Sequence, residues 1–469
     1  MNRFVNVVFI TLCVLMVLPV FAIDHLDLLT TISGEFNGSQ FGYKLVSMDY
    51  NGDGYKDLIV HSPSWNPTGV FDMYNAWGRI YFYWGGHGFD NVADFIISET
   101  HHRDMTLPIC NGGDVNGDGI EDLIVQLSDY QVAIYYGSSG PTGIPGLIIN
   151  TNVPNDPIIP YPLGDVNGDG HADIAMSSLN YHSDTIKIYI WTGISQPWHE
   201  VVAFSNSSGE SWPYGVGDVN GDSIADYVVH HSISEGLNTD QRIVLYYGNQ
   251  SFPQVDSLVI SANTHCLAGM GACPLGDVNN DGYNDFMTFH EKIWYGGEDI
   301  TATPDLALAY QTEWHDWNNL VYSRIPYCIY GDLNGDGYDD VIGSNPYIGY
   351  YDGEVGIWLG AANMNGACDL YIRPPWDYET CQFGWDKATG DFNGDGICDL
   401  AVSAPEYYSA PQWAEGRVFV YSGSTQFVGN EDLLIPDAGT SQWQINLFPN
   451  PYTQCEGIHI EFDGDGNTQ

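Results

Sequence analysis

The sequence predicts an all-β fold, a seven-bladed β-propeller built from four-stranded blades. Three observations lead to this prediction. An acidic nine-residue stretch, such as DVNGDGIED at 114–122, occurs seven times along the chain. Short runs rich in β-branched and aromatic residues, bounded by Gly and Asn turns, recur between the copies. Helical periodicity is missing, and repeats of this length without helices are typical of radially arranged sheets.

Each repeat contains the same parts in the same order. In the first, the acidic stretch is followed by a strand at 58–60, an aliphatic and aromatic strand at 79–85 that ends in Gly, and an apolar triplet at 95–97. The residues before the next acidic stretch supply the fourth strand. A linear array of small domains is the alternative, but one unit of this size would bury too little apolar surface to be stable alone. The copies begin 51 to 65 residues apart, at Asp49, Asp114, Asp165, Asp218, Asp277, Asp332 and Asp391.

The propeller is expected to span residues 23–440, and its ends offer two candidates for the outer strand of the last blade. LDLLTTI at 26–32 precedes the first repeat as DLLIPD at 432–437 follows the last. An N-terminal strand that completes the last blade would close the ring. The sequence does not decide which of the two pairs there.

Side chains with oxygen atoms stand at fixed positions of the acidic stretch. Positions 1, 5 and 9 are Asp and position 3 is Asn in every copy, whereas position 7 varies, as expected where a backbone carbonyl is the ligand. Positions 4 and 6 are mostly Gly, which permits positive φ; Asn280 and Ser223 are the exceptions. Such hard oxygen donors suit Ca²⁺. The predicted ligands of up to seven calcium ions are Asp49, Asn51, Asp53, Tyr55, Asp57, Asp114, Asn116, Asp118, Ile120, Asp122, Asp165, Asn167, Asp169, His171, Asp173, Asp218, Asn220, Asp222, Ile224, Asp226, Asp277, Asn279, Asp281, Tyr283, Asp285, Asp332, Asn334, Asp336, Tyr338, Asp340, Asp391, Asn393, Asp395, Ile397 and Asp399.

The acidic loop opens like that of an EF-hand but does not continue like one. An EF-hand requires Glu at position 12 and flanking helices. Position 12 is here an apolar strand residue in most copies, for example Val60 and Val125. Asp at position 9 would close the site instead. An ordinary Asp, Asn and Gly turn is the alternative for any single copy, and seven copies in one register argue against it.

The charge balance excludes several classes of partner. Only 12 Lys and Arg residues accompany 60 Asp and Glu, which gives a formal net charge of −48. A nucleic-acid-binding protein needs a basic surface, and an anionic membrane would repel this chain. Aromatic residues make up 14% of the sequence, so the chain can bury a core rather than remain disordered. We therefore expect many of the carboxylates to bind cations.

The N-terminus carries a targeting feature. In residues 1–22, Arg3 precedes an apolar run from Phe4 to Val20 that ends in small residues. This pattern is typical of a secretory signal peptide cleaved after Ala22, with a membrane anchor as the alternative. No other segment is apolar enough to cross a bilayer. The mature protein is therefore expected to be secreted or held at the cell surface, without a transmembrane segment.

The pairing of the cysteines stays open. Nine are present, and Cys13 falls in the signal segment. An even number outside the cytosol permits disulfides. The candidates by proximity are Cys266 with Cys273 and Cys368 with Cys381. A recurring position, four residues before an acidic stretch, equally suggests packed thiols at Cys110, Cys273 and Cys328.

The first and last repeats resemble the FG-GAP repeats of integrin α subunits and their bacterial relatives. The first has Phe41 and Gly42 before the loop and HSP at 61–63 after it; the last has Phe383, Gly384 and SAP at 403–405. The middle copies keep the loop without a clear FG and are similar to VCBS-type repeats. The resemblance implies a propeller with calcium loops on one face and ligand contacts on the opposite face. Integrin leg and transmembrane regions are missing here, so a receptor role does not transfer.

The C-terminal segment 441–469 has a second resemblance. NLFPNPY at 446–452, followed by an alternating strand, resembles the start of the C-terminal sorting domain used in type IX secretion, cut short. This resemblance implies contact with an outer-membrane secretion machinery. A plain strand after a Pro turn is the alternative.

The sequence favours a non-catalytic recognition or adhesion module for a glycan or protein ligand. No Ser-His-Asp order, GxSxG, HExxH or phosphate-binding Gly loop is present, so no catalytic residue is predicted. The alternatives are an extracellular polysaccharide-degrading enzyme and a purely structural surface protein. Flat aromatic side chains in the variable loops suit sugar rings or protein contacts, although they could equally pack between blades. The candidate ligand-binding residues are Trp65, Trp77, Trp314, Trp317, Tyr350, Trp376, Tyr407 and Trp413.

Overall fold

The fold is taken from a computed structural model of the chain. It divides into two compact units, Met1–Asp432 and Leu433–Gln469. The predicted signal segment, the strand candidate at 432–437 and the tail at 441–469 lie outside the described residues. The structure describes residues 25–36, 38–69, 76–98, 109–128, 130–150, 158–178, 185–191, 199–205, 208–235, 238–252, 256–262, 272–288, 291–309, 328–348, 352–374, 381–407 and 415–427.

All described strands of the first unit pair antiparallel within four-stranded sheets, which we call blades one to seven in chain order. Blade one contains β2 (Lys44–Met48), β3 (Asp57–Ser62), β4 (Arg79–Tyr83) and β5 (Phe95–Ser98). Blade two contains β6 (Ile109–Asn111), β7 (Leu123–Ser128), β8 (Gln131–Tyr135) and β9 (Leu147–Asn150). Blade three contains β10 (Ile158–Gly164), β11 (Asp173–Ser178), β12 (Thr185–Trp191) and β13 (His199–Ser205).

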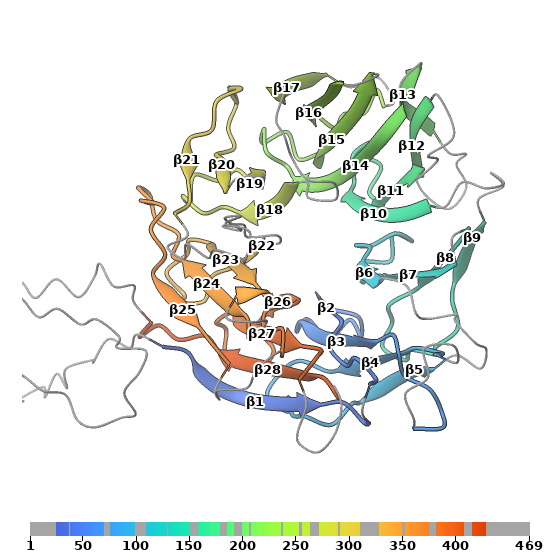
Figure 1. Ribbon diagram of the computed structural model, residues 1–469, viewed down its shortest axis with the longest axis vertical. Helices are drawn as coiled ribbons and strands as arrows, with labels where there is room; N and C mark the ends of the chain where they lie inside the picture. The colour runs from blue at the N-terminus through green and yellow to red at the C-terminus, as the bar shows by residue number, and fades with distance from the viewer. Residues whose placement is uncertain are drawn as a thin grey trace, which may run out of the picture. The chain divides into compact units, whose positions relative to one another are not determined.

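The remaining blades follow the same order (Figure 1). Blade four contains β14 (Ser208–Gly217), β15 (Asp226–Glu235), β16 (Asn238–Tyr246) and β17 (Ser257–Ala262). Blade five contains β18 (Ala272–Gly276), β19 (Asp285–Thr288), β20 (Lys292–Trp294) and β21 (Leu306–Ala307). Blade six contains β22 (Cys328–Gly331), β23 (Asp340–Asn345), β24 (Glu354–Trp358) and β25 (Leu370–Ile372). Blade seven contains β26 (Lys387–Gly390), β27 (Asp399–Ala404), β28 (Arg417–Ser422) and β1 (Asp27–Ser33).

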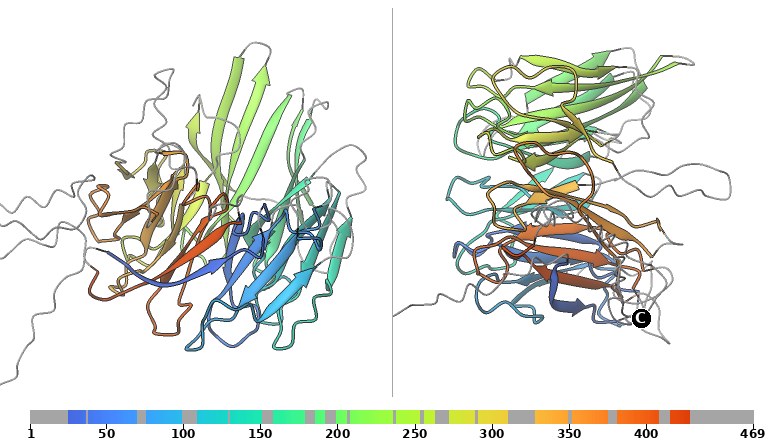
Figure 2. Two further views of the ribbon diagram at one scale, coloured as in Figure 1. Left: turned by 60° about the horizontal axis from the view of Figure 1, so that its bottom comes forward. Right: turned by 90° about the vertical axis from the view of Figure 1, so that its left-hand side faces the viewer.

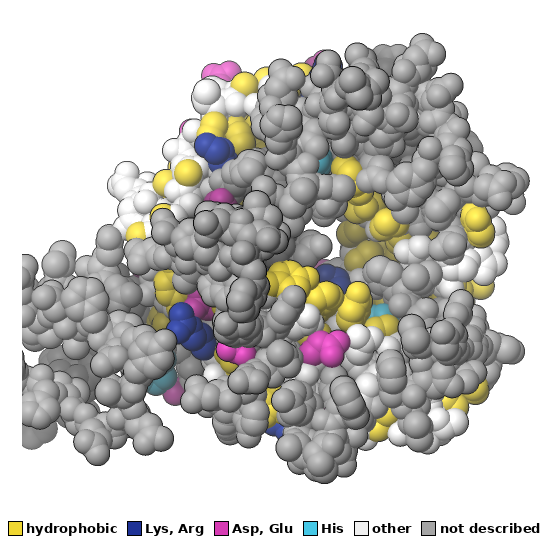
Figure 3. All heavy atoms as spheres, in the orientation of Figure 1, with side chains coloured by type: hydrophobic (Ala, Val, Ile, Leu, Met, Phe, Trp, Pro, Cys, Tyr) yellow, Lys and Arg dark blue, Asp and Glu magenta, His cyan; other side chains and the backbone are white. Residues whose placement is uncertain are grey.

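The first strands of the blades form a closed ring. Each of β2, β6, β10, β14, β18 and β22 contacts the first strand of the next blade, and β26 contacts β2. Figures 1 and 2 show the blades fanning out from these inner strands, and in Figure 3 described hydrophobic side chains gather around the central opening. The predicted all-β propeller of four-stranded blades is thus confirmed, and a linear array of domains is excluded.

The ring closes on the N-terminal strand. β1 pairs antiparallel with β28, with Ile32 opposite Val418, and forms the outer edge of blade seven. Ile32 is only 1% exposed and packs in the apolar cluster between blades seven and one. The blade is therefore completed by residues from both ends of the unit. This settles the first of the two strand candidates as the closing strand.

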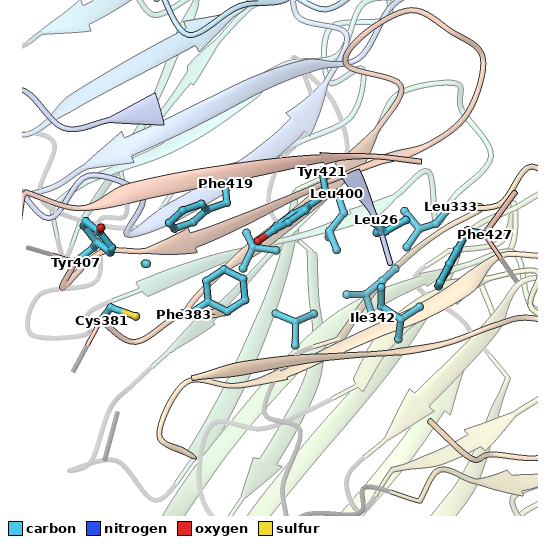
Figure 4. Packing of buried hydrophobic residues seen from close by; sticks show 14 residues of the cluster. Leu26, Leu333, Ile342, Cys381, Phe383, Leu400, Tyr407, Phe419, Tyr421 and Phe427 are labelled. Carbon is cyan, nitrogen blue, oxygen red and sulfur yellow. The ribbon is translucent and has the colours of Figure 1, made fainter. Parts of the chain in front are cut away.

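The apolar core lies between the blades rather than within them. Each of the seven buried clusters draws residues from two neighbouring blades, including blades seven and one. Between blades six and seven, for example, Phe383, Phe419 and Tyr407 pack together with Ile342 and Leu333 of the neighbouring blade (Figure 4). A single repeat therefore has no core of its own, which is the physical reason that the repeats must form a ring.

Candidate functional site: the acidic loops and the opposite edge

Each acidic loop lies between the first and second strands of a blade and is wound around its first Asp. In the loop of blade two, the amides of Gly117 and Asp118 donate to Asp114 Oδ1 at 2.7 and 3.0 Å, and the amide of Gly119 donates to Oδ2 at 2.7 Å. The bonds from positions 5 and 6 recur in all seven loops. The winding requires positive φ at positions 4 and 6. Asn280 and Ser223, the two exceptions to Gly, adopt φ of 54° and 69°, as predicted.

The middle of the loop is held by the side chains at positions 3 and 5. In blade two, Asn116 Oδ1 accepts the amide of Asp118 at 2.8 Å, and Asp118 Oδ1 accepts the amide of Ile120 at 3.0 Å. The bond to the position-5 carboxylate is present in every loop. The first and fifth positions thus present carboxylates that are already oriented by backbone amides, at one end of the two inner strands of each blade.

The Asp at position 9 is buried in every loop. All seven of these residues are 0% exposed. In blade two, Asp122 Oδ2 accepts the amides of Val115 at 3.0 Å and Asn116 at 3.2 Å. Its Oδ1 accepts the amide of Gly137, just beyond the third strand, at 2.9 Å. This carboxylate therefore joins the loop to the third strand. The residues are Asp57, Asp122, Asp173, Asp226, Asp285, Asp340 and Asp399.

Burial destabilises the ionised form of these carboxylates. Desolvation raises the pKa to about 7 for Asp57, Asp122, Asp226 and Asp285, and the position-5 carboxylate of the same loop adds repulsion. The same cause raises the pKa of Asp173 to about 8, and that of Asp399 to about 6. The hydrogen bonds from backbone amides only partly offset it. Such a carboxylate gains from a bound cation or, without one, from a proton.

The donor set fits calcium, although the carboxylates do not converge on a point. Within the described ranges, no three Asp, Glu, His or Cys side chains are grouped closely enough to hold a metal. In blades two, four, five and six the Asn amide at position 3 donates to the Asp at position 5, at 2.9 to 3.3 Å. An amide hydrogen thus partners a carboxylate that calcium binding would need. The donors are all oxygens, mostly anionic, which is the chemistry that Ca²⁺ prefers.

The position-7 side chain has a role that the sequence did not reveal. A Cβ at Gly52, position 4 of the first loop, would lie 2.8 Å from Ile120 Cδ1 of the next loop. Gly117 faces His171, and Gly221 faces Tyr283, in the same way. The side chain at position 7 therefore covers the glycine of the preceding loop. Position 7 can vary because the contact needs only bulk, whereas a side chain in place of Gly52, Gly117 or Gly221 would have no room.

Backbone hydrogen bonds link each loop to the next blade. At five junctions the amide at position 8 donates to the position-1 carbonyl of the preceding loop at 2.8 to 3.3 Å, as from Ala172 to Asp114. At six junctions an amide just beyond the third strand donates to the position-2 carbonyl of the preceding loop at 2.8 to 3.0 Å, as from Ser138 to Tyr50. Any ligand that stiffens one loop therefore stiffens a junction between blades.

The candidate ligand-binding aromatics are only partly placed by the structure. Trp65 and Tyr407 are buried, at 7% and 6% exposure, which contradicts a role as open stacking surfaces. Trp65 instead lies against the guanidinium of Arg79, whose Cζ is 3.4 Å from the ring centroid, and Tyr407 lies under Arg417. Trp77 is half-buried beside Trp65. The other five, Trp314, Trp317, Tyr350, Trp376 and Trp413, lie outside the described residues.

A different aromatic group lies at the edge of the ring opposite the acidic loops, which we call the FG edge. Tyr43 and Trp385 have ring centroids 5.4 Å apart, and Tyr347 lies 6.5 Å from Trp385. Tyr43 and Tyr347 are exposed. The signal for two of them was present in the sequence, since Tyr43 and Trp385 each follow an FG pair. The group brings together blades one, six and seven.

The comparisons with known proteins agree with this architecture. A model of the FG-GAP-like repeat matches residues 114–176 and 165–229, and a model of the FG-GAP repeat matches 383–421. Integrin alpha-6 of Gallus gallus is 28% identical over 166 residues, which covers 33% of this chain and 15% of that protein. Integrin alpha-PS2 of Drosophila melanogaster is 30% identical over 180 residues, covering 34% and 12%. Phosphatidylinositol-glycan-specific phospholipase D of Dictyostelium discoideum is 30% identical over 126 residues, covering 22% and 13%.

These matches identify the repeat without transferring a whole protein's activity. The chain spans no more than 15% of the length of these relatives. Within the described residues no helix is long and apolar enough to cross a membrane. The matched repeats, the FG pairs in blades one and seven and the loop frame occur together in one ring. The chain therefore carries FG-GAP-type repeats at the matched residues, and its β-propeller is built from repeats similar to those of integrin α subunits.

Proposed function

We propose that this chain is a secreted or cell-surface recognition or adhesion module, without catalytic activity, whose ring is stabilised by calcium in its acidic loops. The observation that carries the proposal is the loop frame. Seven loops present oriented carboxylates beside a fully buried Asp. The described hydrogen bonds to that buried carboxylate come only from amides. A bound cation would supply the positive charge that these loop carboxylates require.

Electrostatics supports calcium rather than a basic side chain as that partner. The chain has 12 Lys and Arg residues against 60 Asp and Glu. Several of the described basic residues form ion pairs outside the acidic loops, for example Arg79 with Glu35 and Lys44 with Asp386. Lys56 lies in a loop but pairs with Glu121 of the next loop. Ca²⁺ would neutralise each cluster and stabilise the folded ring through mass action.

The FG edge is the proposed ligand face. The rings of Tyr43, Trp385 and Tyr347 lie side by side there, and Trp385 Nε1 is tied to the carbonyl of Tyr43 at 3.1 Å. Rings held in this way offer apolar faces with polar edges, which suit a sugar ring or a protein side chain. The ion pair of Lys44 with Asp386 borders them and adds polar contacts. A glycan or protein ligand is therefore proposed for this edge.

The ends of the chain belong to the same proposal. A signal peptide at residues 1–22 would direct the chain to an exterior where millimolar calcium is common. A tail at 441–469 recognised by a type IX secretion machinery would allow transport across an outer membrane. The match to integrins, which are surface proteins, supports the extracellular setting. A polysaccharide-degrading enzyme is the competing function, favoured by no described side-chain arrangement.

Calcium titration of the full-length chain tests the metal part. We expect several ions to bind and the melting temperature to rise by 10 °C or more between calcium-free and millimolar-calcium buffer, because each site at about 100 times its Kd contributes about 2.7 kcal/mol. Magnesium at the same concentration should stabilise less. Asp118→Asn should remove one ion, whereas Asp90→Asn, an exposed carboxylate outside the loops, should remove none. An unchanged melting temperature in calcium would overturn the proposal.

A glycan array, followed by capture of surface proteins, tests the recognition part. Binding by the wild-type chain should be saturable, and Trp385→Ala should weaken it at least tenfold while calcium stoichiometry stays unchanged. Asp90→Asn again serves as the control. Release of shortened oligosaccharides during the incubation would favour the enzyme instead.

A further inference from the structure

One residue of each inner strand occupies the same register, four residues before the first Asp of the loop. We call these residues the inner layer. Because the inner strands of neighbouring blades are in contact around the ring, adjacent members of this layer lie at the same register of contacting strands. Blades three and four show this directly, since Tyr161 and Tyr214 have ring centroids 5.6 Å apart. The layer consists of Leu45, Cys110, Tyr161, Tyr214, Cys273, Cys328 and Lys387.

Two thiols are neighbours in this layer. Cys273 lies in β18 and Cys328 in β22, in adjacent blades, and both belong to the apolar cluster between blades five and six. The Cys328 thiol lies close enough to Cys273 to lower the pKa of that thiol, whereas burial raises the pKa of Cys328 well above its usual value. Cys328 is 6% exposed, whereas Cys273 is partly exposed. The two thiols are thus neighbours in one cluster, and Cys273 is the more exposed residue of the two.

The next member of the layer is a buried cation. Lys387 of β26 is 3% exposed, and its Nζ donates to Ser344 Oγ at 2.5 Å. Its charge lowers the pKa of both Cys273 and Cys328, but in Cys328 burial outweighs this and keeps the pKa well above its usual value. A thiolate is the reactive form of cysteine, and a nearby cation increases its population. The inner layer therefore places two neighbouring thiols next to a buried lysine, and of the two Cys273 is the one whose pKa is lowered.

We propose that Cys273 and Cys328 form a disulfide that links blade five to blade six when the chain meets an oxidising exterior. The oxidant is a disulfide of the low-molecular-weight class. The Cys273 thiolate attacks one of its sulfurs, the disulfide bond breaks, and one small thiol leaves. The Cys328 thiol then gives up its proton, its sulfur attacks the Cys273 sulfur, and the second small thiol is displaced. The protein loses two electrons and two protons, and both end on the two released thiols.

The junction is one where such a link would matter. In blade five the outer strand β21 contains only two residues, and the ladder between β20 and β21 has two residue pairs. The described outer contact of this blade with blade six is a short bridge, in which the amide of Ala309 donates to Gly366 at 2.7 Å. A covalent bond between β18 and β22 would join the two blades at their inner strands, on the side of the sheets away from this bridge. It would also close a long loop of the unfolded chain, which is the larger source of its stabilisation.

The experiment uses the full-length chain in calcium with 2-hydroxyethyl disulfide, an uncharged oxidant that the acidic surface does not repel. After denaturing alkylation, peptide mass spectrometry should find Cys273 linked to Cys328. The melting temperature should rise by about 5 °C over that of the dithiothreitol-treated chain. Cys328→Ser should instead retain a mixed disulfide on Cys273. This last readout does not depend on the variant's stability.

Cys110→Ser is the matched control, because Cys110 occupies the same register in β6 but lies between Leu45 and Tyr161. This variant should still form the link. A peptide that joins Cys273 to Cys266, or two thiols that stay free for alkylation while the oxidant is consumed elsewhere, would overturn the proposal. Neither result bears on calcium binding, so the failure of this inference and that of the proposed function are distinguishable.

Discussion

The two edges of the propeller join the same blades by different means. At the acidic edge the joints repeat: an amide of one loop donates to the position-1 carbonyl of the preceding loop, at five junctions. At the FG edge the described joints are particular to two junctions. At each of them the Phe of an FG pair lies over a glycine of the preceding blade. Phe41 lies over Gly416, and Phe383 lies over Gly353. One edge is therefore a repeated frame, and the other is built locally.

This difference separates stability from recognition. A ring held at every junction by one loop design can vary its other edge without losing closure. Blade four makes use of this freedom, since β14, β15 and β16 are 10, 10 and 9 residues long and extend beyond their neighbours (Figure 2). Aromatic residues gather at the same edge in blades one, six and seven. We expect substitutions at the acidic edge to act on the whole ring, and those at the FG edge to act on one junction or on a ligand.

The largest effect is expected at the acidic edge, from Asp399→Ala. Asp399 accepts the amides of Phe392, Asn393 and Gly423 at 3.0 to 3.1 Å, and it is 0% exposed. Its loss leaves buried amides without partners, which costs about 1–3 kcal/mol each before the structure relaxes. We predict a loss of about 4 kcal/mol in the free energy of unfolding, measured in urea with calcium present.

Asp395→Ala is the matched variant in the same loop. Asp395 is exposed and accepts one amide, that of Ile397 at 2.9 Å. Both variants remove a proposed calcium ligand, so both should lose one ion. In calcium-free buffer, however, Asp395→Ala should cost less than about 1 kcal/mol, as expected for an exposed hydrogen bond. Equal losses for the two variants in that buffer would show that burial of position 9 contributes nothing of its own.

A smaller effect is expected at the FG edge, from Gly416→Ala. Gly416 has φ of 78°, and a Cβ there would collide with the backbone of Phe41 in the next blade. Left-handed strain alone costs about 1–2 kcal/mol. We predict a total loss of about 3 kcal/mol, because a backbone atom cannot move aside as a side chain can.

Gly396→Ala isolates the contact between blades. Gly396 has φ of 90°, similar to that of Gly416, but no atom lies within 4 Å of the position that a Cβ would take. This variant should lose only the strain energy, about 1 kcal/mol. If the two glycine variants unfold at the same urea concentration, the FG crossing is not a joint between the blades.

Prediction from the sequence also succeeded to different degrees at the two edges. The acidic loops could be placed residue by residue because seven copies in one register fix the role of each position. The packing of Ile120 over Gly52 escaped prediction, since it joins residues 68 apart in the sequence. At the FG edge no repeated pattern was available for selecting the candidate ligand-binding residues. Trp65 was chosen for its place in a variable loop, whereas the structure covers its ring with Arg79.

The change that sharpens the comparison most is that of pH, which acts on the acidic edge. Burial raises the pKa of Asp57, Asp122, Asp226 and Asp285 from 3.8 to about 7 in the folded chain. Between these values the folded state binds more protons than the unfolded state, so stability without metal must rise as the pH falls. Calcium requires the ionised form and reverses the sign. In metal-depleted buffer we expect the melting temperature to increase by several degrees from pH 8 to pH 6, and in millimolar calcium to decrease over the same range. Parallel curves would mean that the ion and the proton do not compete for the buried carboxylates.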